Sequence, residues 1–425
     1  MKKIPLKKQL EFLDWEFGVF FHFGIRTFFP GHDDWDGKEM QAEKFYPTEL
    51  DCEQWIIAAK KAGATYAVFT AKHHDGFALW PSEYTQYSVA NSPWKDGKGD
   101  VVREFTDACR KHGIKVGLYY SPAQWGSYAI PFSCAKEYDD YFINQLGELL
   151  TNYGKIDYLW FDGCGSENHT YDHARIVSEI YRMQPDILTF CDPEWTPGVR
   201  WVGNEDGYAS LYNPLVVSST DFSELATKEQ TLSNAAFLPA ECDCRLRYTW
   251  FYDNNEDTIK SLDELFGMYQ STVGRGSNFL LNIGPDMRGL LPDADIARLL
   301  ELGDRIRESY GNCLLFEPIE KNGDEHIIVN SHSLKKGWRK PLHERICNCL
   351  SIKEDIANGQ SITSFRIWAV PPIYTKKRLL MYEGRTVGHK VYCHFPSIRA
   401  ERFIVEVTGH NGDYRLTDIK AHFVK

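Results

Sequence analysis

One carboxylate stands out by its position in the sequence. Asp162 directly follows residues 158–161 (YLWF), a short apolar run that predicts a fully buried strand. An acid at the carboxyl end of such a strand would lie at the edge of a sheet, held by a rigid element. Paired with a second carboxyl, it could serve as acid, base or nucleophile in hydrolysis of a glycosidic bond. The candidates for that second group are Glu205, in a loop-like stretch, and Glu241, at the end of another predicted strand.

Histidines accompany two other apolar runs and admit three interpretations. His73 and His74 come shortly after residues 66–70 (YAVFT), and His22 lies in residues 19–23 (VFFHF). Adjacent residues of a strand point to opposite faces, so His73 and His74 could bind one metal ion only if the strand breaks there. We favour hydrogen bonding to a substrate, with a structural role at the sheet edge and a metal site as the alternatives.

The elements that would position these side chains alternate between strand-like and helix-like segments up to about residue 310. Helices are expected after Asp51, Asp100 and Asp172 and over residues 136–153, which implies βα units and a parallel sheet. Polar residues follow successive strands at intervals of 43 to 51 residues, at His22, His73, Tyr119, Asp162 and Glu205. This ring of positions, without a Gly-rich turn near the first strand, favours a (β/α)8 barrel over a doubly wound sheet.

The sequence pattern changes at about Glu317. Residues 364–370 (SFRIWAV) and 402–407 (RFIVEV) alternate apolar and polar side chains with a period of two. This pattern is typical of a small antiparallel domain, and we expect a β-sandwich. The predicted domains are therefore a catalytic barrel at 1–316 and a C-terminal β-sandwich at 317–425.

Composition excludes several classes of protein. The 425 residues carry a formal net charge of -11, which disfavours nucleic acid or an anionic membrane as a partner. The 11 cysteines are scattered, as is typical of free thiols in a reducing compartment. No stretch has the length of a membrane span or the pattern of a signal peptide. We expect a cytoplasmic protein, whose oligomeric state the sequence leaves open.

Four motifs occur in order along the barrel region: residues 17–24 (FGVFFHFG), 71–77 (AKHHDGF), 117–122 (GLYYSP) and 160–163 (WFDG). Together they resemble glycoside hydrolase family 29, the α-L-fucosidases. Residues 200–205 (RWVGNE) and 239–241 (PAE) are similar to the subfamily that prefers branched α1-3/4 fucosides. The chain departs from many relatives at Asp34, where they have Glu, and at Asp253, where they commonly have His.

The resemblance implies a retaining exo-hydrolase that removes terminal fucose from fucosylated oligosaccharides and uses neither cofactor nor metal. Asp162 matches the family nucleophile and Glu205 the acid/base of the subfamily, with Glu241 as the alternative acid/base if the subfamily match fails. Other positions match residues that hold the sugar hydroxyls or form an apolar wall for the methyl group. They are His22, Asp34, Trp35, His73, His74, Tyr119, Trp160, Arg247 and Trp250.

Two other functions stay open at this point. A metal-dependent barrel hydrolase would use His22, His73, His74 and Asp162 as ligands, and chelation would abolish its activity. A non-catalytic carbohydrate-binding protein would hold fucose without hydrolysing any fucoside.

Overall fold

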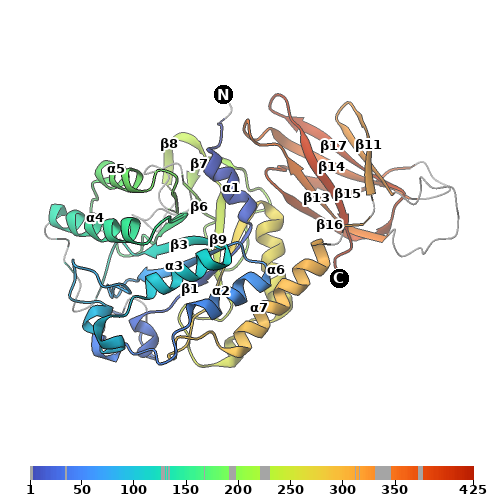
Figure 1. Ribbon diagram of the computed structural model, residues 1–425. Coiled ribbons are helices and arrows are strands. Elements are labelled where there is room, and N and C mark those ends of the chain that lie inside the picture. Colours follow the sequence, from blue (N-terminus) through green and yellow to red (C-terminus); the bar gives the residue numbers. More distant parts are fainter. Residues whose placement is uncertain are drawn as a thin grey trace.

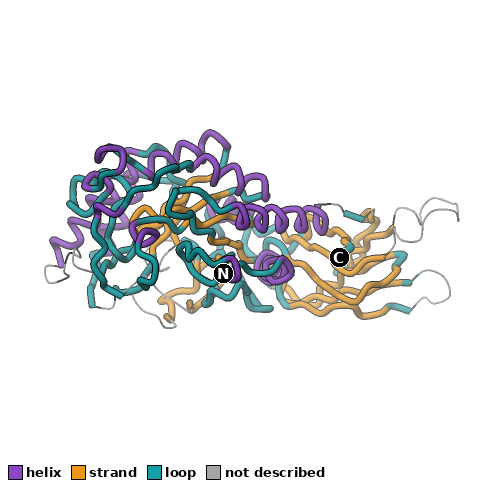
Figure 2. Tube along the Cα trace, turned by 90° about the horizontal axis from the view of Figure 1, so that it is seen from below, coloured by secondary structure: helices purple, strands orange, loops and turns teal. Residues whose placement is uncertain are grey.

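The computed structural model describes residues 3–33, 36–125, 130, 132, 135–166, 168–190, 198–220, 230–311, 313–314, 316–330, 346–371 and 377–425. Two parts are visible in Figure 1: a sheet surrounded by helices, and a second part built from strands. Seen from below in Figure 2, the two parts lie end to end, with the helices confined to the first. The fold class predicted from the sequence is therefore confirmed, whereas the boundary at residue 317 stays a prediction.

Eight parallel strands form the first part. Their order around the sheet is β5-β4-β3-β2-β1-β10-β9-β6. A parallel bridge between Phe190 and Val199 joins the two ends of this sheet and closes it into a barrel. The strands are β1 (Phe17–Phe21), β2 (Tyr66–Lys72), β3 (Lys115–Tyr120), β4 (Tyr158–Phe161), β5 (Leu188–Phe190), β6 (Arg200–Trp201), β9 (Ala240–Arg245) and β10 (Ser277–Asn282).

Helices cover the outside of the barrel. Three of them begin where the sequence predicts, because Asp51, Asp100 and Asp172 each accept a hydrogen bond from the backbone N–H three residues on. The helices are α1 (Lys7–Trp15), α2 (Cys52–Ala62), α3 (Val101–His112), α4 (Ala135–Asn152), α5 (His173–Met183), α6 (Leu262–Thr272) and α7 (Asp293–Ile306). Between β6 and β9 the described residues form no helix; a hairpin of β7 (Val216–Thr220) and β8 (Gln230–Phe237) stands there.

Shorter helical turns connect these elements. They are η1 (Ile25–Phe28), η2 (Ala42–Lys44), η3 (Val89–Asn91), η4 (Trp94–Gly97), η5 (Glu256–Thr258), η6 (Val273–Arg275) and the π-helical turn η7 (Arg307–Gly311). None of the helices in the described ranges is long and apolar enough to cross a membrane.

Aromatic side chains fill the barrel interior. Phe20, Tyr66, Tyr119, Tyr158 and Trp160 belong to one buried cluster there. At the amino-terminal end of the strands α1 closes the barrel: its Phe12 joins this cluster, and the Phe12 carbonyl accepts a hydrogen bond from Asn278 Nδ2 at 2.7 Å. The opposite end, where the strands finish, is left for the site, as in other barrels of this kind.

The C-terminal part is an antiparallel β-sandwich. One sheet has the order β11-β12-β17-β14-β15 and the other the order β16-β13-β18. Between them lies a separate apolar core that includes Ile328, Leu350, Phe365 and Phe403. The strands are β11 (Phe316–Asn322), β12 (Glu325–Asn330), β13 (Ile346–Glu354), β14 (Ile362–Val370), β15 (Leu379–Gly384), β16 (Val391–Arg399), β17 (Arg402–His410) and β18 (Leu416–His422).

The sandwich packs against the barrel through specific contacts. The rings of Tyr310 and Tyr392 stack with centroids 4.0 Å apart, and Lys390 forms an ion pair with Glu16 at the start of β1. These contacts anchor the second part to the side of the barrel away from the site.

Candidate active site

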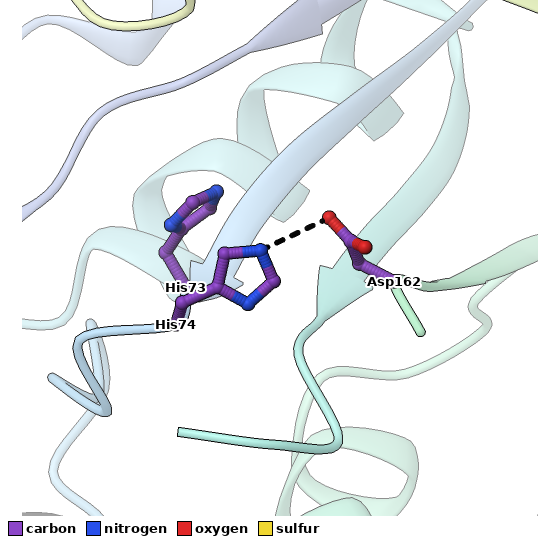
Figure 3. Close-up of side chains that lie close together, drawn as sticks. All are labelled: His73, His74 and Asp162. Atoms are coloured by element: carbon purple, nitrogen blue, oxygen red, sulfur yellow. Dashed lines mark ion pairs between the residues drawn. The ribbon is translucent and has the colours of Figure 1, made fainter. Parts of the chain in front are cut away.

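Asp162 lies at the rim of the barrel, one residue beyond the end of β4. Its Oδ2 accepts a hydrogen bond from the Tyr119 hydroxyl at 2.9 Å and lies 3.3 Å from His74 Nε2. Its Oδ1 accepts a hydrogen bond from the backbone N–H of Cys164 at 3.1 Å. Figure 3 shows the His74 ring turned toward Asp162, with His73 next to it. The side chain is 25% exposed, so a ligand can reach the carboxylate.

The surroundings of Asp162 keep it ionised. Burial alone would raise the pKa of this carboxyl, but the charge of the His74 ring and hydrogen bonds from His74, Cys164 and Tyr119 outweigh burial. The net effect holds the pKa below its usual range. Asp162 is therefore a carboxylate at neutral pH, which is the form that a nucleophile requires.

Ser121 fixes the orientation of the His74 ring. Ser121 Oγ lies 2.7 Å from His74 Nδ1, and the Ser121 hydroxyl donates its hydrogen to the Ala123 carbonyl at 2.5 Å. Because a hydroxyl has a single hydrogen, Ser121 must accept from His74, so Nδ1 is protonated and Nε2 faces Asp162. The contact with Asp162 is an ion pair when the ring is charged. Ser121, His74 and Asp162 contact one another in the sequence of a catalytic triad, but Ser121 is fully buried, which excludes it as a nucleophile.

His73 and His22 occupy the same rim as uncharged rings. His73 stacks on Tyr119 with centroids 5.3 Å apart, and its Nδ1 has no hydrogen-bond partner in the described parts of the chain. His22 Nδ1 lies 2.7 Å from Asn282 Oδ1. Burial holds the pKa of His22 down to about 3 and that of His73 well below its usual value. A neutral imidazole has one nitrogen that donates and one that accepts a hydrogen bond, which suits recognition of hydroxyl groups.

Glu205 lies in the loop after β6, and its side chain is 43% exposed. Arg245 Nη2 lies 3.5 Å from its Oε2. Partial burial raises the pKa of Glu205; Arg245 opposes this, and the negative charge of Asp162 raises the pKa further. The net pKa is above its usual value, which favours the protonated form that a general acid needs. Glu205 therefore lies close enough to Asp162 for the charge of Asp162 to act on it.

Glu241 occupies a different level of the barrel. It is fully buried and accepts hydrogen bonds from the hydroxyls of Tyr66 at 2.6 Å and Tyr158 at 2.9 Å and from Trp160 Nε1 at 3.0 Å. Burial outweighs these donors and raises its pKa to about 7. A carboxyl enclosed by three side chains is poorly placed to protonate a leaving group, so these surroundings favour Glu205 over Glu241 as the acid/base.

Two tryptophans give the site apolar walls. Trp160 stacks on Phe190 with ring centroids 4.1 Å apart and on Tyr119 at 5.4 Å. Trp250 lies beside His22 at 4.8 Å and under the Arg245 guanidinium at 5.2 Å. The predicted residues Asp34 and Trp35 lie outside the described residues.

Arg247, which the sequence predicts to bind the sugar, has carboxylate partners within the protein. Its guanidinium forms a two-pronged ion pair with the buried Asp295, at 2.7 and 2.9 Å, and a further ion pair with Asp253 at 3.2 Å. These two carboxylates hold the guanidinium in place. Asp253 is the position where relatives commonly have His, so the departure in sequence supplies one of the anions. The arginine beside Glu205 is Arg245.

A group of three side chains could also offer ligands to a metal ion. Ligand atoms of His73, His74 and Asp162 lie within 4.8 Å of one another. However, both His74 nitrogens and both Asp162 oxygens already have hydrogen-bond or ionic partners within the protein. The arrangement therefore fits a carboxylate stabilised by its neighbours, and chelation is the experiment that separates the two interpretations.

Three residues at the site were missed in the sequence: Arg245, Ser121 and Asn282. A signal existed for Arg245, because residues two apart on a strand share a face. Every second residue of β9 leads from the barrel interior toward the rim: Glu241, Asp243 and then Arg245. Ser121 and Asn282 act on histidines of other strands, and such contacts have no pattern in the sequence.

Comparison with known proteins shows the family to which this chain belongs. The family described as alpha-L-fucosidase matches residues 5–309. Alpha-L-fucosidase 1 of Arabidopsis thaliana is 32% identical over 428 residues, covering 94% of this chain and 83% of its own. The chain belongs to the α-L-fucosidase family. It is a glycoside hydrolase of family 29, as the four motifs predicted.

Solved structures of the α-L-fucosidase family agree with the whole fold. A putative alpha-L-fucosidase from Bacteroides thetaiotaomicron has a TM-score of 0.87 at 30% identity, covering 100% of this chain and 99% of that one. A glycoside hydrolase 29 family member from an unknown rumen bacterium has a TM-score of 0.86 at 32% identity, covering 100% and 78%. Barrel and sandwich are thus both shared with these relatives.

Proposed function

We propose that this α-L-fucosidase is a retaining exo-enzyme in which Asp162 is the nucleophile and Glu205 the acid/base. The assignment is supported by the surroundings of the two groups: His74, Tyr119 and Cys164 hold Asp162 at the rim, and Arg245 lies beside Glu205. The pKa of Asp162 is lowered and that of Glu205 is raised. Two carboxyl groups whose pKa values are driven apart are suited to nucleophile and acid.

The proposed reaction has two displacements. In the first, an Asp162 oxygen forms a bond to the anomeric carbon while the glycosidic C–O bond breaks, and the leaving oxygen takes the proton of Glu205. In the second, Glu205 takes a proton from water, the water oxygen attacks the anomeric carbon, and the ester to Asp162 breaks. The product is α-L-fucose, and the enzyme regains its starting protonation. Such a mechanism needs the two carboxyl groups about 5 to 5.5 Å apart.

We assign the remaining residues by their surroundings. His22 and His73 hydrogen-bond the sugar hydroxyls, Trp160 and Trp250 contact its apolar faces, and His74 and Tyr119 hold Asp162. For the substrate we propose terminal fucose in α1-3/4 linkage on a branched oligosaccharide. The similarity of residues 200–205 to the subfamily supports this choice, as does the exposure of Glu205 toward solvent, where a large leaving group would lie.

Hydrolysis of an aryl α-L-fucoside and of a Lewis-type branched trisaccharide, each with and without EDTA, tests the proposal. We expect release of fucose from both, unaffected by EDTA, and NMR of the first product should show the α-anomer. Activity on the aryl fucoside alone would refute the linkage. Release of β-fucose would refute the retaining mechanism. Inactivation by EDTA and recovery with zinc or manganese would establish the metal-dependent alternative, and fucose binding without hydrolysis the non-catalytic one.

A further inference from the structure

Asn282 links two parts of the site that come from different strands. It is the last residue of β10, beside Phe20 of β1 in the sheet register, and is 1% exposed. Its Oδ1 lies 2.7 Å from His22 Nδ1, and its Nδ2 donates to the Trp250 carbonyl at 2.7 Å. One buried amide therefore contacts both His22 and the segment that carries Trp250.

The hydrogen-bonding capacities of these groups determine where the hydrogens lie. A backbone carbonyl can only accept, so the group of Asn282 that faces the Trp250 carbonyl must be the NH2 group. The amide oxygen then faces His22 and can only accept as well. His22 Nδ1 must therefore carry a hydrogen.

Burial determines whether the second nitrogen of His22, Nε2, also carries a hydrogen. Apolar rings enclose the imidazole: Phe20 at 4.4 Å, Trp250 at 4.8 Å and Phe251 at 5.5 Å between ring centroids. His73 lies at 5.5 Å, and burial opposes a second proton on a ring in such surroundings. In the neutral ring with hydrogen on Nδ1, Nε2 carries a lone pair and can only accept a hydrogen bond.

We propose that Asn282 is a positioning residue that holds His22 in the Nδ1–H tautomer, so that Nε2 accepts a hydrogen bond from a substrate hydroxyl, and that the same amide fixes Trp250. The identity of that substrate as an α-L-fucoside rests on the proposed function. The tautomer does not, because it is a property of the free enzyme. Because His22 Nε2 can only accept, the sugar hydroxyl that contacts it must donate the hydrogen.

The first experiment is ¹⁵N NMR of the histidine side chains in the free enzyme, with His22→Gln to assign the signal. We expect the Nδ1–H tautomer in the wild type, the same tautomer in Asn282→Asp, and a mixture in Asn282→Ala. Asn278→Ala is the matched control, since Asn278 is also 1% exposed on β10 but donates to the Phe12 carbonyl at the other end of the barrel. An Nε2–H tautomer in the wild type, or one unchanged in Asn282→Ala, would overturn the proposal.

The second experiment uses binding of L-fucose, measured as a competitive inhibition constant. Asn282→Ala should weaken binding about tenfold and Asn278→Ala should not, as expected for loss of one or two hydrogen bonds. If Asn282→Ala does not fold, Asn282→Asp serves instead, because its carboxylate still accepts from His22 Nδ1 but repels the Trp250 carbonyl instead of donating to it; about threefold weaker binding is then expected. Unchanged binding in the folded variant would contradict the positioning role.

The direction of the hydrogen bond can be tested with the sugar itself. L-Fucose analogues with one hydroxyl replaced by fluorine cannot donate at that position, and one of them should bind the wild type poorly. In His22→Ala, which lacks the acceptor, the same analogue should bind as well as fucose does. If every fluoro analogue binds as fucose does, Nε2 is not an acceptor and the proposal fails. Absence of fucoside hydrolysis by the wild type would instead refute the proposed function and leave the NMR result intact.

Discussion

The carboxyl groups at the rim of the barrel and the one inside it are the same functional group in opposite surroundings. Asp162 and Glu241 each accept several hydrogen bonds from the protein. At Asp162 a histidine adds a charge, and the pKa is lowered. At Glu241 the hydrogen-bond donors are all neutral and the side chain is fully buried, and the pKa rises to about 7. Hydrogen bonds alone therefore do not determine the protonation state; the nearest charge and access to water do.

Glu205 lies between these two extremes. It is partly open to water, close to one cation and influenced by one anion, and its pKa is raised. The comparison predicts which carboxyl groups take part in chemistry and which contribute to folding only. The substitutions below test that division, beginning with the one that should affect activity most.

Asp162→Ala should abolish turnover, lowering kcat by about four orders of magnitude or more, because no other group can form the covalent bond. The measurement is hydrolysis of an aryl α-L-fucoside, with thermal unfolding to confirm that the fold is intact. Asp162→Asn is the matched control for shape, since it keeps the size of the side chain and removes the charge. Activity close to the wild type in either variant would remove Asp162 from the mechanism.

Glu205→Gln should lower kcat by about 10²- to 10⁴-fold on an oligosaccharide, the usual contribution of a general acid. The loss should be much smaller on an aryl fucoside with an acidic phenol, since that leaving group needs no proton. The ratio of the two rates is therefore the measurement. Equal losses on both substrates would indicate that Glu205 acts in another way.

Arg245→Met should move the alkaline limb of the pH–activity profile upward. The Arg245 charge lowers the pKa of Glu205, so without it the pKa of Glu205 rises and the protonated acid persists to higher pH. The profile of kcat/KM between pH 4 and 9 reports this limb, and Arg245→Lys should keep it near the wild-type position. A limb that stays in place in Arg245→Met would show that Glu205 does not set it.

Glu241→Gln should change activity least and alter how stability depends on pH. The folded pKa of about 7 lies above the ordinary value of 4.5. The protonated group therefore contributes stability fully below pH 4.5, and this contribution is lost as pH rises through 7. The loss is at most about 3.5 kcal/mol, from about 1.4 kcal/mol per unit of pKa. Denaturant unfolding at pH 5 and pH 8 should show a smaller difference for Glu241→Gln than for the wild type; an equal difference would argue against the raised pKa.

The sequence predicted those parts of the fold and site that depend on local pattern. Apolar runs placed β1 to β5 and β10, and strand ends placed Asp162, His73 and His74 at the rim. It could not predict β6, because a strand of two residues, Arg200–Trp201, has no periodicity to recognise. Nor could it place Arg247, whose direction is set by Asp295 on α7, or Glu241, whose donors come from β2 and β4. These features depend on contacts between segments far apart in the chain.

The closure of the barrel has a consequence for how such enzymes can diversify. Glu205 follows β6, the shortest strand of the wall. Within the described residues, β5 is joined to this side of the sheet by one bridge, between Phe190 and Val199, and a hairpin follows β6. Asp162 follows β4, which is paired with neighbours on both sides. Insertions or substitutions near Glu205 therefore disturb few pairings of the wall. In the proposed mechanism Glu205 faces the leaving group, so this segment can be remodelled by mutation while the surroundings of Asp162 stay unchanged, and new linkage preferences are accessible without a new scaffold.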